Sequence, residues 1–311
     1  MRLLRAELAR LFARRFTKVM LVVLVLALCV IGAVVAANTH KITAEDLRQA
    51  QVQAAQEREN CKQQTPAADQ HFCDQIDAAN YLPYVLDFRD QMPELLLVYA
   101  GLLALLGYIV GASFIGVEAS SGGLANLLLW RPQRIRVLFG KFTALLLGMV
   151  VIGVVVGAGW TAAVWGIARL RGNPGDPTQG SWMSLGLDGA RGLGLVLLTS
   201  LTGAAIASLG RRTAAALGLL IGYLVVWEVG ARLVMQALRV PPDLYMLSSY
   251  VIAFLDKRYE YWLGAPCYEE FGVASGCMGT IHWRWGLAAL GGVTLLAIIA
   301  ATASFRRREV T

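Results

Sequence analysis

The sequence lacks the motifs that nucleotide hydrolysis and hydrolytic catalysis require. No phosphate-binding loop of the form G-x-x-x-x-G-K-[ST] occurs, because the pair Gly140-Lys141 has neither the earlier glycine nor a following hydroxyl residue. There is no H-E-x-x-H motif, and the 311 residues include only 3 His. The sequence also shows no Ser/His/Asp set and no pair of intramembrane carboxylates that could form a catalytic site. The chain therefore cannot bind ATP through such a loop, and we expect no catalytic residues, metal site or cofactor on it.

Charged residues are scarce as well, at 16%, whereas hydrophobic residues make up 57% and the mean hydropathy is +0.55. Several apolar runs exceed the roughly 18 to 20 residues needed to cross a bilayer core of about 30 Å. Each must be helical, because hydrocarbon offers no partner to a free backbone N–H or C=O. We expect an all-α membrane protein with six transmembrane helices, at 17–37, 94–116, 137–167, 187–209, 213–235 and 284–305.

The placement of Lys and Arg predicts the orientation, since short cytoplasmic segments carry the excess of basic residues. With the N-terminus inside, these segments hold 15 of the 28 basic residues but only three acids, Glu7, Glu118 and Glu309. Both termini are therefore expected to be cytoplasmic. The net charge of +7 then reflects helix ends that meet lipid head groups, so no nucleic-acid partner is expected.

Residues 1–16 predict an interfacial elbow helix before the first span. Leu4, Leu8, Leu11 and Phe12 lie on one helical side, although Arg15 also falls there. The alternative is a secretory signal peptide, which the long apolar run and the five later spans disfavour.

The segment Gly116 to Lys141 is charged and glycine-marked, and it lies between two apolar runs. An acidic residue precedes Ser/Gly turn residues, a short amphipathic run ending in leucines, a Pro, two Arg and a Gly-Lys. This order resembles the cytoplasmic coupling helix of ABC-2 type (type V) ABC transporter permeases. The resemblance places the coupling segment at 117–136 and implies that its ATPase-coupling residues are Glu118, Gly122, Gly123, Leu124, Leu127, Leu128, Leu129, Arg134 and Arg136.

The resemblance implies a permease of the bacterial cytoplasmic membrane, paired with a second copy or a related permease. A separate ABC ATPase subunit binds ATP and Mg²⁺ and drives export of an amphipathic or lipid-like substrate, such as a drug, a peptide or a glycolipid. The alternative is a membrane scaffold or mechanotransmitting subunit that acts on an extracytoplasmic partner.

The extracytoplasmic loop domain, 38–93, is the least apolar part of the chain. Its strong helix formers and dispersed charges predict a solvated helix that continues upward from the first span. Cys61 and Cys73 predict a disulfide outside the membrane. A zinc site with His71 is the alternative, although only His40 could add a fourth His or Cys ligand from this loop.

The segment 239–283 is broken at Pro241-Pro242 and rich in Tyr and Trp, so it is too interrupted to span the membrane. It occupies the place at which ABC-2 permeases carry two short re-entrant helices. The aromatic residues indicate either an interfacial belt or a substrate exit that would include Tyr250 and Phe254. Cys267 and Cys277 predict a second disulfide.

Glu228 and Arg232 lie four residues apart in the fifth span, in the favourable order for an ion pair within a helix. A charge inside a membrane helix is costly, so each should have a partner. Either the two neutralise each other structurally, or Glu228 lines a central cavity at the dimer seam and contacts a cationic substrate.

Overall fold

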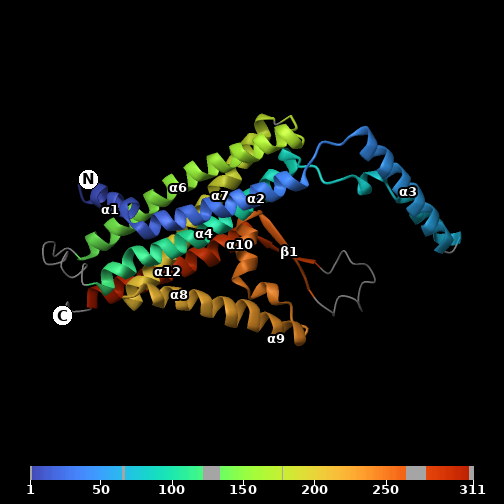
Figure 1. Cartoon of the computed structure of the whole chain (residues 1–311). Coiled ribbons are helices and arrows are strands. Elements are labelled where there is room, and N and C mark those ends of the chain that lie inside the picture. The colour runs from blue at the N-terminus through green and yellow to red at the C-terminus, as the bar shows by residue number, and fades with distance from the viewer. Residues whose placement is uncertain (1, 65–66, 122–133, 177, 264–277, 308–311) are drawn as a thin grey trace. The chain divides into compact units, whose positions relative to one another are not determined.

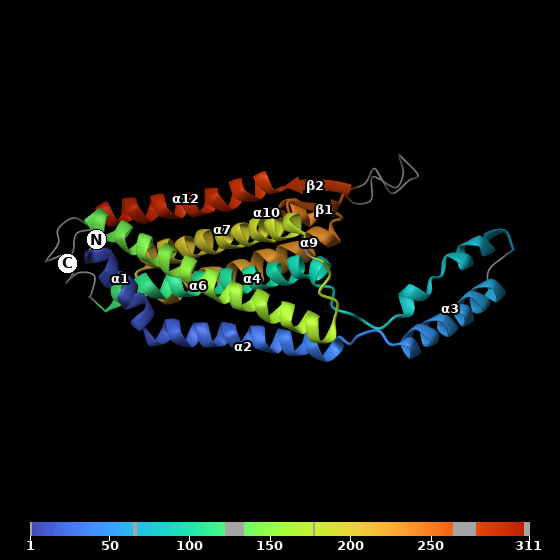
Figure 2. The same ribbon diagram turned by 90° about the horizontal axis from the view of Figure 1, so that it is seen from above.

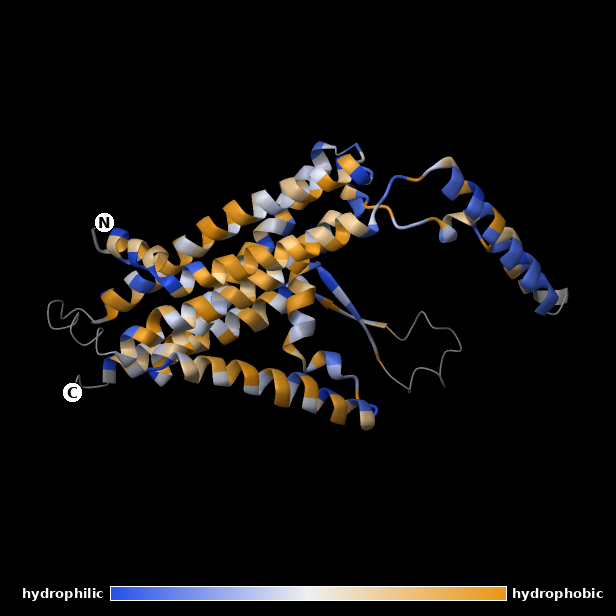
Figure 3. Ribbon diagram, in the orientation of Figure 1, coloured by the Kyte–Doolittle hydropathy of each residue, from blue (hydrophilic) through white to orange (hydrophobic). Residues whose placement is uncertain are grey.

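The computed structural model describes residues 2–64, 67–121, 134–176, 178–263 and 278–307. Six helices are long and apolar enough to cross a bilayer: Arg15–Asn38, Phe88–Ser120, Ile135–Arg171, Gln179–Gly210, Thr213–Ala237 and Trp283–Arg306. The prediction of a helical protein with six such helices is confirmed, and each range expected from hydropathy lies within one of them. Figure 3 shows their apolar character.

The chain divides into two compact units, which are described separately. Unit 1 comprises Met1–Leu26, Glu94–Ala158 and Met183–Thr311, and unit 2 comprises Ala27–Pro93 and Gly159–Trp182. The helices α2 (Arg15–Asn38), α4 (Phe88–Ser120), α6 (Arg134–Arg171) and α7 (Gln179–Gly210) contribute residues to both.

Unit 1 is a helical bundle with α4 at its centre, and 61% of the most apolar stretch of α4 is buried. Its backbone meets that of α7 closely: a methyl group at Gly111 would lie 2.3 Å from the carbonyl oxygen of Ser200, and one at Gly203 would lie 2.3 Å from that of Tyr108. Small residues permit such contacts between membrane helices. In both views the start of α1 (Arg2–Ala13) and the end of α12 (Trp283–Arg307) lie at the same end of this unit as the end of α4 (Figures 1 and 2).

The fifth long helix is not a regular α-helix. It begins as α8 (Thr213–Gly222), continues as the π-helix η3 (Tyr223–Ala231) and ends as α9 (Arg232–Ala237). A π-helix has i→i+5 hydrogen bonds and is common at functional sites. Only 6% of the most apolar stretch of this span is buried within the chain.

The segment between the fifth and sixth long helices differs from the expected pair of short helices. The short turn η4 (Pro242–Leu244) leads into one helix, α10 (Leu247–Leu255), followed by strands β1 (Arg258–Trp262) and β2 (Met278–His282). The strands pair antiparallel from Arg258↔His282 to Trp262↔Met278. The aromatic residues of β1 alternate with charged ones and favour a strand, which explains the departure from an all-α fold. Residues 264–277, with Cys267 and Cys277, lie outside the described residues.

Unit 2 contains α3 (Ala44–Gln64), which the sequence predicted as a continuation of the first span. The chain instead leaves α2 at Asn38 and starts a separate helix. Thr43 and Asp46 begin the new helix, because the Thr43 hydroxyl accepts from the Asp46 backbone N–H while the Asp46 carboxylate accepts from the Thr43 backbone N–H. Such a reciprocal pair of bonds begins a helix.

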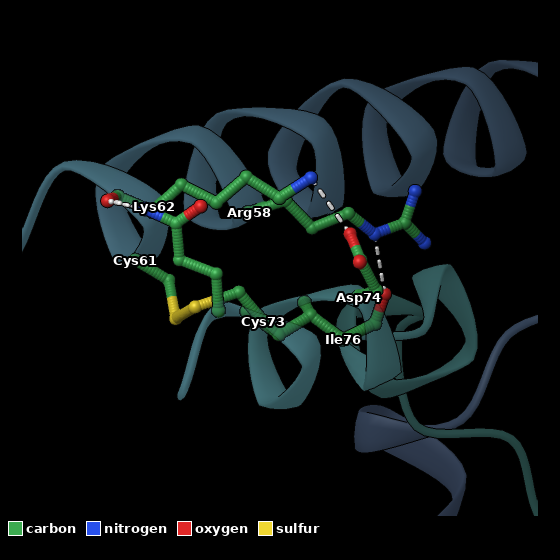
Figure 4. Close-up of a disulfide and its surroundings, with 7 residues drawn as sticks. Arg58, Cys61, Lys62, Cys73, Asp74 and Ile76 are labelled. Carbon is green, nitrogen blue, oxygen red and sulfur yellow. Dashed lines mark hydrogen bonds and ion pairs between the residues drawn. A yellow bond between two sulfur atoms is a disulfide. The ribbon is translucent and has the colours of Figure 1, made fainter. Parts of the chain in front are cut away.

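The helix α3 is paired with η1 (Ala67–Gln75) and η2 (Ala78–Tyr81), and only its Ala50 and Ala54 are buried. The Cys61–Cys73 disulfide joins α3 to η1, so the predicted pairing is confirmed and the zinc alternative is wrong (Figure 4). Lys62 adds an ion pair with Asp74 at 2.7 Å, and Arg58 Nε donates to the Ile76 carbonyl at 2.7 Å (Figure 4).

Candidate functional site

A cluster of charged side chains lies at the end of unit 1 where α4 stops and α6 begins. Lys141 of α6 bonds to Glu7 of α1 at 2.8 Å and forms an ion pair with Glu118 of α4. The other carboxylate oxygen of Glu118 binds Arg14, which stands between α1 and α2. These four residues, here named the buried ion cluster, therefore connect α1, α4 and α6.

The amphipathic pattern of α1 brings Glu7 into this cluster. Leu11, one turn after Glu7, is fully buried, and its Cδ2 atom would lie 2.3 Å from a methyl group at Gly148 of α6. The absence of a side chain at Gly148 thus lets α1 lie directly on α6. Because residues four apart share a helix face, Glu7 points toward the same helix and reaches Lys141.

Arg14 and Lys141 also share an aromatic neighbour. The Arg14 guanidinium donates to the carbonyl oxygens of Ser113 and Phe114 at 3.2 and 3.1 Å. It lies 4.8 Å from the centre of the Phe114 ring, and the Lys141 ammonium lies 5.3 Å from it. An aromatic face attracts cations most strongly when water is excluded.

Burial makes this cluster energetically sensitive. Lys141 is fully buried and Glu7 is 1% exposed, whereas the side chains of Glu118 and Arg14 are 17% and 22% exposed. Two acids and two bases balance in charge, and removal of one partner from a buried pair costs about 3–5 kcal/mol. The cluster therefore holds α1 firmly only while all its members are present.

Glu118 is one of the ATPase-coupling residues that the family resemblance implied. Within this chain it meets Arg14 and Lys141. Arg136 is exposed, and Arg134 opens α6. Gly122, Gly123, Leu124, Leu127, Leu128 and Leu129 lie outside the described residues.

Sequence reasoning missed Glu7 and did not assign Lys141 a site role. A signal was present, because Glu7 is one of only three acids in the short basic segments. Its partner could not be identified from spacing, since 134 residues separate Glu7 from Lys141.

A second polar cluster surrounds Glu228 in the π-helix. The Glu228 carboxylate accepts hydrogen bonds from the Tyr223 hydroxyl at 2.8 Å, the Ser248 backbone N–H at 3.0 Å and the Ser248 hydroxyl at 2.8 Å. The Tyr223 hydroxyl in turn accepts from the Leu247 backbone N–H at 3.1 Å. The fifth span therefore satisfies the first backbone donors of α10, the role that a helix-capping residue has.

The expected Glu228–Arg232 pair is present but long, at 4.0 Å. Arg232 is 3.9 Å from Asp243 and donates to the Ser248 hydroxyl at 3.3 Å. Asp243 also accepts from the Tyr259 hydroxyl at 3.1 Å. Burial, and then the Asp243 charge, raise the pKa of Tyr259.

Tyr250 and Phe254, the other two predicted substrate-pathway residues, do not join this cluster. The Tyr250 hydroxyl donates to the Leu244 carbonyl at 2.9 Å. Phe254 is buried against α7 and α12, where its ring lies 3.4 Å from a methyl group placed at Gly194. Among the described residues, no group of three His, Cys, Asp or Glu could hold a metal ion.

Comparison with known proteins adds one family. A family model described as ABC-2 family transporter protein matches residues 11–255. The match runs from α1 through α10, so it includes Arg14, Glu118, Lys141 and the cluster around Glu228. A comparison with curated proteins finds no match.

Proposed function

Because the chain belongs to the ABC-2 transporter family, whose permeases work with an ABC ATPase, we propose that it is the permease subunit of an exporter. In this proposal a separately encoded ATPase binds ATP and Mg²⁺ and drives an amphipathic or lipid-like substrate outward. The six apolar helices and the lack of a nucleotide-binding motif in the sequence support a transport role without chemistry on this chain.

The observation that carries the proposal is the buried ion cluster. It ties α1 to the two helices that flank residues 122–133, which the ATPase would grip within the coupling segment 117–136. Force applied there would reach α1, α4 and α6 together, because an uncompensated buried charge opposes their separation. In this scheme α1 is the interfacial elbow helix on the cytoplasmic side.

The orientation with both termini in the cytoplasm fits this scheme. The start of α1, the end of α4, the start of α6 and the end of α12 lie at one end of unit 1, whereas β1 and β2 lie at the other (Figures 1 and 2). The basic residues near the first end favour the cytoplasmic side of a bacterial membrane. In the same scheme α10 is the described part of a re-entrant outer segment.

A second permease copy would cover the fifth span. Val225, Val226 and Val229 are each more than half exposed, and only 6% of the most apolar stretch of this span is buried. Such a face requires lipid or another helix. We propose a homodimer in which Glu228 and Arg232 position α10, with Tyr250 and Phe254 on that helix beside the exit.

The test combines the substitutions Leu128→Asp and Leu129→Asp. We expect the variant to insert normally but to lose most ATPase co-purification and transport in vesicles, because two charges would replace the apolar contact surface. Leu170→Asp is the control, since Leu170 is 79% exposed at the far end of α6. Full ATPase binding and transport in the double variant would refute coupling through 117–136.

The hairpin of α3 and η1 favours one alternative function, transmission of movement to an extracytoplasmic partner. It is braced by a disulfide and buries little of α3, so most of its surface is free to bind. Replacement of residues 44–81 by a short Gly-Ser linker separates the two functions. Exporter activity should survive it, whereas a mechanotransmitting subunit would lose its output.

A further inference from the structure

Helix α12 carries a groove that neither cluster described above includes. Its volume is about 660 Å³, and it is lined by His282, Trp283, Arg284, Trp285 and Ala288. His282 is the last residue of β2, and the other four residues lie in the first two turns of α12, at the end opposite Arg307. Two indole rings, an imidazole and a guanidinium line this groove, and the proposed function does not use it.

Arg284 supplies a positive charge that no described residue neutralises. It makes no ion pair within the described residues, and its guanidinium lies 5.9 Å from the Trp283 ring. Its basic neighbours are already paired: Asp188 lies 3.4 Å from both Arg191 and Lys257, and Arg258 pairs with Glu260. The groove is therefore suited to an anion.

An apolar track continues from the groove along the same face of α12. Residues spaced three or four apart share a helix face, and Trp285, Ala288, Gly292, Leu296 and Ile299 follow this spacing. Trp285, Leu296 and Ile299 are 66%, 69% and 55% exposed. A methyl group at Gly292 would find no atom within 4 Å among the described residues, so the track is open at its middle.

The length of α12 places these features at different depths in a membrane. Its 25 residues extend about 36 Å, slightly more than the hydrocarbon core of roughly 30 Å. The groove then lies at head-group level, where Trp is favoured, and the track lies among the acyl chains. A cationic groove above an apolar track is complementary to one phospholipid, which has an anionic head group and apolar acyl chains.

We propose that α12 binds one anionic phospholipid of the leaflet that meets β2, with its phosphate beside Arg284 and His282 and one acyl chain along the track through Gly292. Under the orientation of the proposed function this is the outer leaflet. The binding itself does not depend on transport, so a failure of export would leave it standing.

Native mass spectrometry of the purified full-length protein tests the site with phosphatidylglycerol and phosphatidylcholine of the same acyl chains. We expect at least a fivefold preference for phosphatidylglycerol. Arg284→Gln should abolish that preference, whereas Arg306→Gln, at the other end of α12, should retain it. Equal binding of the two lipids, or an equal loss in both variants, would overturn the proposal.

Two further experiments identify the molecule that fills the groove and the track. Gly292→Leu should fold normally, because the position is open, but should weaken phosphatidylglycerol binding severalfold by filling the track. An excess of glycerol 3-phosphate should not displace the lipid; displacement, or full binding by Gly292→Leu, would show a head-group site alone and contradict the track. The variant Ala288→Cys, made in a Cys29→Ser background, tests for a second copy of the chain at the groove. Disulfide-linked dimers of this variant would show that a second copy covers α12 and would refute lipid binding at this site.

Discussion

At the residue scale, one lysine decides how the ends of three helices are joined. Lys141 has two acidic partners, but only Glu7 depends on it for full compensation, because Glu118 also binds Arg14. Glu7 has a second contact with Arg10 at 3.0 Å, and the Arg10 side chain is 52% exposed. An exposed partner contributes far less than a buried one.

We therefore expect Lys141→Met to lower the free energy of unfolding by about 3–5 kcal/mol, because it leaves Glu7 buried without its ammonium partner. Arg10→Gln should cost less than about 1 kcal/mol. The double variant Glu7→Gln, Lys141→Met should recover part of the loss. Denaturant unfolding in micelles measures all three, and equal losses in Lys141→Met and Arg10→Gln would show that the buried contact contributes little.

A second residue-scale prediction concerns pH. A hydrogen bond and the charge of Lys62 hold the pKa of Asp74 below its usual range. A carboxyl group whose pKa is lower in the folded state stabilises the fold above its unfolded pKa of about 3.9, and the contribution disappears as the pH falls toward the folded value. The hairpin should thus lose stability below about pH 4, to a lesser degree in Asp74→Asn. Glu59→Gln is the control, and an unchanged acid transition in Asp74→Asn would contradict the assignment.

At the element scale, the first backbone N–H groups of α10 donate to side chains of another helix. Glu228 and Tyr223 take the place of a local cap, because the residue before α10, Met246, has no side-chain acceptor. The π-helix presents both side chains to α10, five residues apart. The two elements should therefore loosen together when either partner is changed.

Glu228→Gln should raise amide exchange in the first turn of α10 by about tenfold, since a charge-assisted bond to a backbone donor contributes roughly 1.5–3 kcal/mol. Glu260→Gln, whose side chain is 50% exposed, should leave α10 unchanged. Hydrogen exchange resolved by peptide reports this. If α10 exchanges normally while transport of a cationic substrate falls, Glu228 acts in a cavity rather than as a cap.

The hairpin of α3 and η1 offers the other element-scale test. Closing the 12-residue separation between Cys61 and Cys73 restricts the unfolded chain and stabilises the hairpin by about 3 kcal/mol. Cys61→Ser with Cys73→Ser should make 44–81 protease-sensitive, whereas Cys29→Ser should not, because Cys29 is a free thiol. Non-reducing peptide mapping of the same sample also tests the pairing predicted for Cys267 and Cys277.

At the scale of the whole molecule, hydropathy was sufficient to predict the six long helices, because a bilayer leaves the backbone no other way to satisfy its hydrogen bonds. The family followed from the ordered residues around Glu118. The contacts between helices could not be predicted from the sequence, because tertiary packing brings Glu7 and Lys141 together. Sequence spacing also assumed a regular helix at Glu228, and the family resemblance implied short helices where β1 lies; local geometry overrode both.

The backbone contact between α4 and α7 has a mechanical consequence. Two helices that touch at Gly111 and Gly203 cannot slip along each other without driving a carbonyl oxygen into the neighbouring chain. A push at Glu118 should therefore move the two helices together. Glu118 and Leu96 are about 33 Å apart along α4, so a small rotation of α4 about one of these residues would displace the other by several ångströms.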